Sequence, residues 1–268
     1  MTARLHVERS TQVGPSVILL HSAGLSGSQW RRLGPELVKR ELRPVAVDLT
    51  GHGASEPWPE PEPFSFRRDV EQVVELLKEE EGAHVVGHSY GALVGLHAAV
   101  AAPAAVRSLT LYEPVAFGVL ETAEDEDARV TLTRVSLRWG ESPADHDAWL
   151  EQFVDYWSGS GAWAALREQA RAEFRRVGWV VYEGVRSLLD DKTRGATFAT
   201  VTAPTHLFTA ERSPLAARRV VQRLGEAIGG ARITTIPGVG HMGPLTNPDV
   251  VNPLLLAAIA AKTPAAAG

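Results

Sequence analysis

Short apolar runs alternate along most of the chain with longer segments in which apolar residues recur at helical spacing. Uninterrupted apolar runs are typical of strands that are buried on both faces of a parallel sheet. The longer segments have one apolar face, as helices that pack on such a sheet do. This alternation predicts an α/β fold with a doubly wound, mostly parallel sheet. The expected strands cover residues 16–20, 43–49, 85–88, 106–112, 204–209 and 232–236, and the expected helices cover residues 28–39, 65–80, 92–101, 214–228 and 248–262.

Residues 118–200 interrupt this alternation once. The segment is highly charged, mostly helical in pattern and rich in tryptophan. We expect it to form a helical cap over the carboxyl ends of the strands, with residues 1–117 and 201–268 as the core. Its acidic run, residues 121–127, is expected to be solvated. The tryptophans form either the core of the cap or the wall of an apolar pocket; they are Trp139, Trp149, Trp157, Trp163 and Trp179.

The composition narrows the range of partners. The 268 residues carry a formal net charge of −5, which leaves no basic surface for nucleic acid. The chain has no cysteine, which excludes disulfides, thiolate metal sites and a cysteine nucleophile. No apolar run is long enough to cross a bilayer, and the amino-terminal residues lack the apolar core of a signal peptide. We therefore expect one large cytoplasmic domain with neither a nucleic-acid nor a membrane partner.

The most informative motif is Gly-His-Ser-Tyr-Gly at residues 87–91, between an expected strand and an expected helix. A serine at the apex of so tight a turn needs small residues two positions away on either side, which explains Gly87 and Gly91. The first backbone N–H groups of the helix are unpaired and point at whatever is bound to the serine. The motif therefore indicates a nucleophile at Ser89.

A serine hydroxyl needs a base that removes its proton, and a third group must orient that base. His241 is the candidate base, because it follows Gly240 in the glycine-rich loop after the last expected strand. From that loop its side chain can reach Ser89. His88 adjoins the nucleophile but is expected to point away from it and to pack.

Four segments together resemble the α/β-hydrolase superfamily in their order and spacing, namely residues 21–24, 48–55, 87–91 and 240–241. The resemblance implies the α/β-hydrolase fold. Because the amino-terminal part is short, we expect the sheet to lack the family's first strand, with residues 5–9 as an edge strand. The resemblance also implies a Ser–acid–His triad and an oxyanion hole of two backbone N–H groups, which by position are those of Ala23 and Tyr90. It implies that His21 braces its loop by hydrogen bonding.

The acid of the triad is not at the position that most relatives use. There the family has an aspartate, whereas this chain has Ser213, which cannot carry the charge that holds an imidazolium. Glu113 follows the strand before the cap, a position that some relatives use for the acid. Glu211 lies two residues before the missing aspartate and, by alternation along the strand, should point differently. Both candidates keep the order Ser, acid, His; Glu113 is favoured.

These residues predict a cofactor-independent serine hydrolase that cleaves a carboxylic ester or a similar acyl substrate. The glycine-rich loops match no dinucleotide or phosphate motif, and no histidine pair has metal-ligand spacing in a matching context. The expected partner is a small-molecule, apolar ester or acyl substrate, because a bulky, apolar acyl or alcohol group suits the site better than a charged one. Lactonase, carbon–carbon bond hydrolase, and acyltransferase or biosynthetic tailoring chemistry on the same triad stay open, as does a non-catalytic ligand-binding member of the fold, which the missing aspartate at 213 favours.

Overall fold

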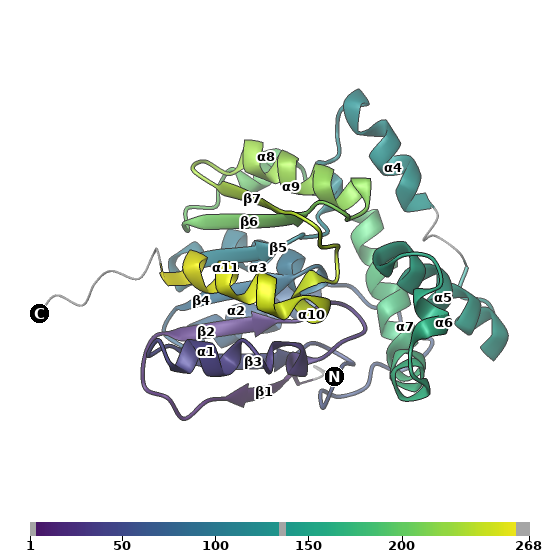
Figure 1. Cartoon of the computed structure of the whole chain (residues 1–268), viewed down its shortest axis with the longest axis horizontal. Coiled ribbons are helices and arrows are strands. Elements are labelled where there is room, and N and C mark those ends of the chain that lie inside the picture. Colours follow the sequence, from purple (N-terminus) through teal and green to yellow (C-terminus); the bar gives the residue numbers. More distant parts are fainter. Residues whose placement is uncertain (1–3, 134–137, 261–268) are drawn as a thin grey trace, which may run out of the picture.

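A computed structural model describes residues 4–133 and 138–260. In this part of the chain seven strands form one sheet in the order β1-β3-β2-β4-β5-β6-β7 (Figure 1). β1 is an edge strand antiparallel to β3, and all other neighbours are parallel. The strands are β1 (His6–Arg9), β2 (Ser16–Leu20), β3 (Arg43–Asp48), β4 (Ala83–His88), β5 (Val106–Tyr112), β6 (Thr205–Ala210) and β7 (Arg232–Ile236).

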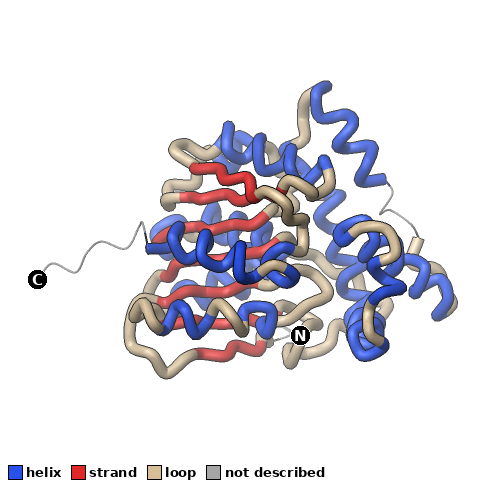
Figure 2. The backbone as a smooth tube through the Cα atoms, in the orientation of Figure 1, coloured by secondary structure: helices blue, strands red, loops and turns tan. Residues whose placement is uncertain are grey.

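Helices cover both faces of this sheet (Figure 2). Successive residues of a strand point to opposite faces, so each buried strand contributes to two cores. Val17 and Leu19 of β2 cluster with residues of α1 and α11, whereas Ile18 and Leu20 cluster with residues of α2, α3 and α9. The predicted doubly wound fold is confirmed, and within the described residues no strand precedes β1. The bounds are α1 (Gly34–Val38), α2 (Arg67–Glu79), α3 (Tyr90–Ala101), α9 (Leu215–Ala227) and α11 (Pro248–Ala260), with the short α10 (Gly243–Thr246) before α11.

Between β5 and β6 the described chain contains helices and loops but no strand. Figure 1 shows α5, α6 and α7 beyond one edge of the layered core, where the parallel strands have their carboxyl ends. The predicted helical insertion is confirmed, while its division from the core at residues 118 and 200 stays a prediction. Its helices are α4 (Glu126–Leu132), α5 (Pro143–Ser158), α6 (Ala162–Ala165), α7 (Glu168–Asp190) and α8 (Gly195–Phe198), with 3₁₀ turns at Phe117–Val119 and Ala123–Asp125.

The helix expected at residues 28–39 is instead two short elements. A 3₁₀ helix covers Gly27–Trp30, and α1 begins only at Gly34. Pro35 occupies the first turn of α1, where its missing N–H would have no partner in any case. Proline therefore starts a new helix here and does not continue the preceding one.

No helix within residues 4–133 and 138–260 combines the length and the apolar character that crossing a bilayer requires.

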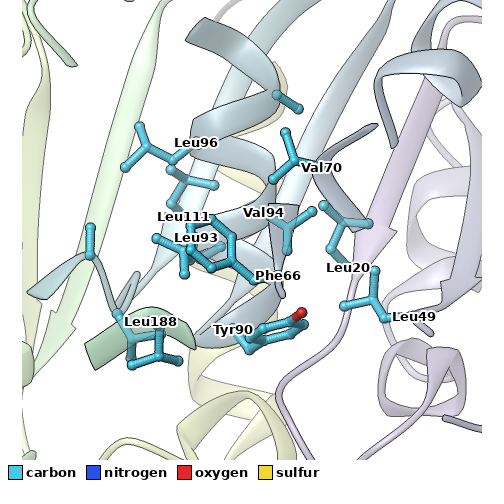
Figure 3. Close-up of a cluster of buried hydrophobic side chains, with 14 of the residues drawn as sticks. Leu20, Leu49, Phe66, Val70, Tyr90, Leu93, Val94, Leu96, Leu111 and Leu188 are labelled. Atoms are coloured by element: carbon cyan, nitrogen blue, oxygen red, sulfur yellow. The ribbon is translucent and has the colours of Figure 1, made fainter. Parts of the chain in front are cut away.

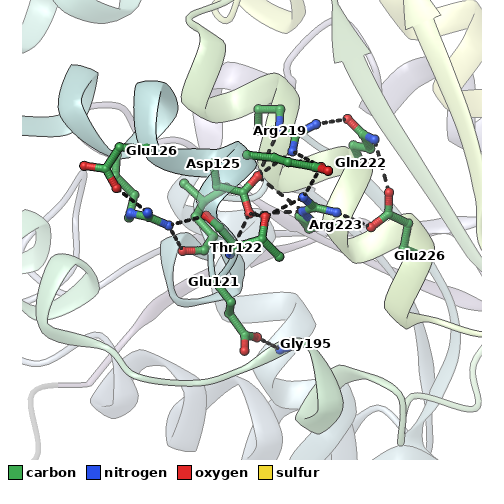
Figure 4. Close-up of polar contacts among 12 residues, drawn as sticks. Glu121, Thr122, Asp125, Glu126, Gly195, Arg219, Gln222, Arg223 and Glu226 are labelled. Carbon is green, nitrogen blue, oxygen red and sulfur yellow. Dashed lines mark hydrogen bonds and ion pairs between the residues drawn. The ribbon is translucent and has the colours of Figure 1, made fainter.

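The acidic run at residues 121–127 is not solvated throughout. Asp125 is fully buried, and its carboxylate accepts hydrogen bonds from Arg219 and Arg223 of α9 (Figure 4). Burial opposes its ionisation, but hydrogen bonds from Arg223 and from the other donors lower the pKa of Asp125 to about 2. The prediction was wrong at this position because a local charge pattern does not show which distant arginines fold against it. The other acidic residues of the run are exposed.

Replacing Asp125 by asparagine should lower the free energy of unfolding by about 2 kcal/mol at pH 7, because two arginines lose their common counter-charge. The pKa of Asp125 is lowered in the folded state, so its stabilisation is present above the usual value of 3.8 and is lost as the pH falls towards about 2. Urea unfolding across this pH range measures the effect. The exposed Asp127→Asn variant is the matched control, and equal stability losses in the two variants would contradict the prediction.

Candidate active site

Ser89 lies on a strained turn between β4 and α3. Its φ of 54° is in the left-handed region, which residues other than glycine rarely adopt. The flanking glycines leave the room that the turn needs. A Cβ at Gly87 would lie 2.6 Å from the Cα of Ala92, and one at Gly91 would lie 2.5 Å from the carbonyl carbon of Leu20. The motif at residues 87–91 therefore has the strand–turn–helix context that the sequence predicted.

The register of two neighbouring strands places Ser89 beside Glu113. His88 and Tyr112 are paired at the carboxyl ends of β4 and β5. Ser89 directly follows His88, and Glu113 directly follows Tyr112. The backbone N–H of Ser89 donates to the carbonyl of Tyr112 at 2.9 Å, which extends the ladder by one residue. Glu113 also has a left-handed φ, of 46°. Both side chains thus leave the sheet at the same edge.

His241 joins these two side chains. Its Nε2 lies 2.9 Å from the Oγ of Ser89, and its Nδ1 lies 2.7 Å from the Oε2 of Glu113. A carboxylate only accepts hydrogen bonds, so Nδ1 carries the proton of a neutral imidazole and leaves Nε2 free to accept the serine proton. All three side chains are buried. The arrangement can therefore remove a proton from Ser89 without exposing any of the three groups to bulk water.

Of the two acid candidates, the structure brings only Glu113 to His241. Its second oxygen, Oε1, accepts hydrogen bonds from the Thr209 hydroxyl and the Ala210 N–H, each at 2.8 Å. The exposed Glu211 instead accepts from the N–H of Gly238 at 2.9 Å.

Ser213, at the position where the resemblance places an aspartate, is buried. Its hydroxyl has no hydrogen-bond partner among the described residues. The residue therefore contributes no hydrogen bond to His241 in this structure.

The loop that carries His241 is held by the last residues of β4 and β5. The Tyr112 hydroxyl donates to the carbonyl of Gly240 at 2.7 Å, and Nε2 of His88 donates to the carbonyl of His241 at 2.9 Å. Burial lowers the pKa of His88 well below its usual range, so this ring is neutral. His88 is buried as predicted, but its bond to the His241 backbone was not foreseen, because nothing in the motif shows which distant carbonyl the ring would meet.

Two backbone N–H groups are in position to act as oxyanion donors. Ala23 and Tyr90 line a cavity together with Ser89, and among the described residues neither backbone N–H has an acceptor. A helix begins at Tyr90, and its first N–H groups have no partner within the helix. These are the groups that the resemblance implied.

Buried histidines brace the loop that contains Ala23. Nε2 of His21 accepts from the N–H of Leu49 at 2.9 Å, and Nε2 of His52 accepts from the N–H of Gly24 at 3.1 Å. Burial lowers the pKa of both histidines to about 4, so both are neutral at pH 7 and keep the lone pairs that accept these bonds. The bracing expected of His21 is present.

The side chain of Tyr90 is held in place by a buried hydrogen bond. Its hydroxyl donates to the buried Asp69 at 2.7 Å, and Asp69 also accepts from the N–H and the hydroxyl of Thr50. Burial raises the pKa of Asp69 and raises that of Tyr90 well above its usual value, so the tyrosine stays protonated and remains a donor. Figure 3 shows the ring of Tyr90 near Leu49 and among the other apolar side chains of the core. The sequence reasoning did not identify this anchor.

Two apolar cavities meet at Ser89. The larger has a volume of about 410 Å³ and the smaller about 30 Å³. Both are lined by Ala23, Ser89, Phe153 and Trp157. Of the described residues that line either cavity, none is an aspartate, glutamate, lysine or arginine. Such walls favour an uncharged substrate.

The tryptophans divide between the two roles that the sequence left open. Trp139, Trp149 and Trp179 contact one another or the ring of Tyr182 within the insertion. In the described chain, only Trp157 among the five lines the cavities beside Ser89, and its ring lies 4.1 Å from that of His241. The sequence contained no signal that singled out this tryptophan.

The sequence as a whole matches a known protein family. The profile of a family described as "Alpha/beta hydrolase family" matches residues 17–254, which is most of the chain. The chain belongs to the alpha/beta hydrolase family. The superfamily resemblance read from the sequence is thereby confirmed.

Individual relatives match a shorter part of the chain than the family profile does. Lipase LipV of Mycobacterium tuberculosis is 37% identical over 117 residues, and a pimeloyl-[acyl-carrier protein] methyl ester esterase of Methylococcus capsulatus is 41% identical over 107 residues. These matches cover 42% and 40% of this chain and 43% and 39% of the relatives, so the chain spans less than half of their length. A thermophilic esterase from Thermogutta terrifontis has a TM-score of 0.72 at 18% identity, covering 97% of this chain and 94% of that protein, which shows a shared fold.

Proposed function

We propose that this alpha/beta hydrolase is a serine esterase that cleaves a small carboxylic ester through an acyl-enzyme. The observation that carries the proposal is the unbroken series of contacts from the Ser89 hydroxyl through both nitrogens of His241 to the buried carboxylate of Glu113. A nucleophile, a base and a group that orients the base are the minimal requirement for this chemistry.

In the first half-reaction, the Oγ of Ser89 attacks the carbonyl carbon while its proton passes to the Nε2 of His241. The carbonyl oxygen becomes an oxyanion, and the N–H groups of Ala23 and Tyr90 donate hydrogen bonds to it. When the intermediate collapses, the bond from carbon to the alcohol oxygen breaks. His241 returns the proton to that oxygen, and the alcohol leaves.

In the second half-reaction, water takes the place of the alcohol. His241 accepts a proton from the water as the hydroxide oxygen bonds to the acyl carbon, and the same N–H groups stabilise the second oxyanion. The bond between the acyl carbon and the Oγ of Ser89 then breaks, and Ser89 regains its proton from His241. Throughout, Glu113 stays ionised and stabilises the imidazolium. Because His241 carries every proton transfer, the proposed cycle needs no cofactor.

Two further observations support an ester as the substrate. The names of the relatives, a lipase and a methyl ester esterase, describe ester cleavage in those proteins. The cavities beside Ser89 have apolar walls without charged side chains among the described residues, which suits a small, uncharged compound.

A fluorophosphonate probe tests the proposal directly, because it reacts only with a serine whose base is in place. Intact-mass measurement should show one probe per wild-type chain and none on the Ser89→Ala variant. The exposed Ser28→Ala variant is the matched control and should label as the wild type does. A folded wild type that stays unlabelled would remove the basis for the esterase.

A further inference from the structure

We propose that the site prefers esters in which a short acyl group is joined to a longer apolar alcohol; this deepens, and rests on, the proposed esterase. The inference starts from the unequal cavities on the two sides of Ser89. Phe153 and Trp157 line both cavities, and they lie four residues apart on α5, on one face of the helix. An ester bound at Ser89 therefore has two apolar spaces of different size for its two arms.

The position of His241 shows which cavity holds the alcohol group of the ester and which holds the acyl group. The leaving alcohol oxygen must come within hydrogen-bond reach of the Nε2 of His241 to take up its proton. His241 and its neighbour Met242 line the larger cavity, whereas the described lining of the smaller one includes neither. The group attached to the leaving oxygen therefore extends into the larger cavity, and the acyl group points into the smaller one, past the oxyanion donor Tyr90.

The volumes of the two cavities limit the lengths of the acyl and alcohol groups. The smaller cavity offers about 30 Å³ to the centre of a water-sized sphere, and on that measure one water molecule needs about 10–15 Å³, so this cavity accepts an acyl chain of about two or three carbons. It is also lined by apolar side chains from three parts of the chain: Val115, Phe117, Leu132, Val185, Leu188 and Leu189. The larger cavity, at about 410 Å³, is in the usual range for a small-molecule site and accepts a chain of several carbons.

Two isomeric esters test this assignment. Octyl acetate and methyl nonanoate have the same atoms and the same ester group, but the long chain is on the alcohol side in one and on the acyl side in the other. We expect kcat/KM for octyl acetate to exceed that for methyl nonanoate by about 100-fold or more, because the nonanoyl chain does not fit the smaller cavity. Equal values, or the reverse order, would overturn the assignment.

Variants in each cavity should move this ratio in predictable ways. Leu188→Ala enlarges the smaller cavity and should bring the ratio of octyl acetate to methyl nonanoate down about tenfold. Ala162→Phe fills part of the larger cavity and should lower kcat/KM for octyl acetate relative to ethyl acetate about tenfold. The exposed Ala164→Phe, two residues away and outside the described linings, is the matched control and should leave both ratios unchanged.

The outcomes separate this proposal from the esterase on which it rests. Fluorophosphonate labelling of Ser89 together with a preference for methyl nonanoate would refute the assignment of the arms and leave the esterase standing. Absence of both labelling and turnover would refute both. Ratios that Ala162→Phe and Ala164→Phe change equally would show that the larger cavity does not hold the alcohol.

Discussion

Replacing His241 by alanine should lower kcat for p-nitrophenyl acetate by about a million-fold, the loss seen when the base of a serine triad is removed. The reason is geometric, since within the described part of the chain only His241 contacts both the Ser89 hydroxyl and the Glu113 carboxylate. Steady-state hydrolysis at saturating substrate measures the effect, and thermal unfolding confirms that the variant is folded.

The half-exposed His6 provides the matched control, and His6→Ala should keep kcat within a factor of about two. Adding Glu113→Gln to His241→Ala should cost little more, because the members of a triad act as a unit. If His241→Ala kept a tenth of the wild-type kcat, another base would have to serve Ser89.

Replacing Glu113 by glutamine should lower kcat about ten-thousand-fold. An uncharged amide neither stabilises the imidazolium nor holds the Nδ1 proton in place, so His241 loses the tautomer that accepts from Ser89. The same assay measures the effect, with Glu211→Gln as the matched control at the other candidate acid. Glu211 contacts a surface N–H, so its replacement should change kcat by no more than a few-fold.

A larger loss in Glu211→Gln than in Glu113→Gln would reverse this assignment. An equally large loss in both variants would indicate that the two substitutions act through folding, which their unfolding curves would show. A small loss in both would point to a triad without an effective acid, and that outcome would favour a ligand-binding role over turnover.

The left-handed conformations of Ser89 and Glu113 have a common cause. Each residue directly follows a parallel strand and must turn its side chain back over the edge of the sheet. His241, from the loop after β7, lies at this edge. Such strain persists only where the surroundings determine the conformation. At Ser89 the surroundings are the close contacts around Gly87 and Gly91, and at Glu113 they are the hydrogen bonds from Thr209 and Ala210.

The sequence was sufficient wherever a local pattern carries its own physical constraint. Uninterrupted apolar runs indicated buried parallel strands, since only a strand covered on both faces can be apolar on both. Gly87 and Gly91 indicated the sharp turn at Ser89, because backbone packs where their side chains would be. His241 followed from the chemistry that an activated serine requires.

Other features depend on contacts between residues far apart in the chain, and no local pattern contains them. Glu113 could be favoured but not chosen, since the choice rests on the register of β4 with β5 and on donors from β6. The burial of Asp125 against Arg219 and Arg223 contradicted a reading of charge alone, because the energetics of an ion pair depend on which groups meet and how far they are removed from water. The selection of Trp157 from five tryptophans, and the unequal cavities that it helps to line, arise only when the helices of the insertion pack over the carboxyl ends of the strands.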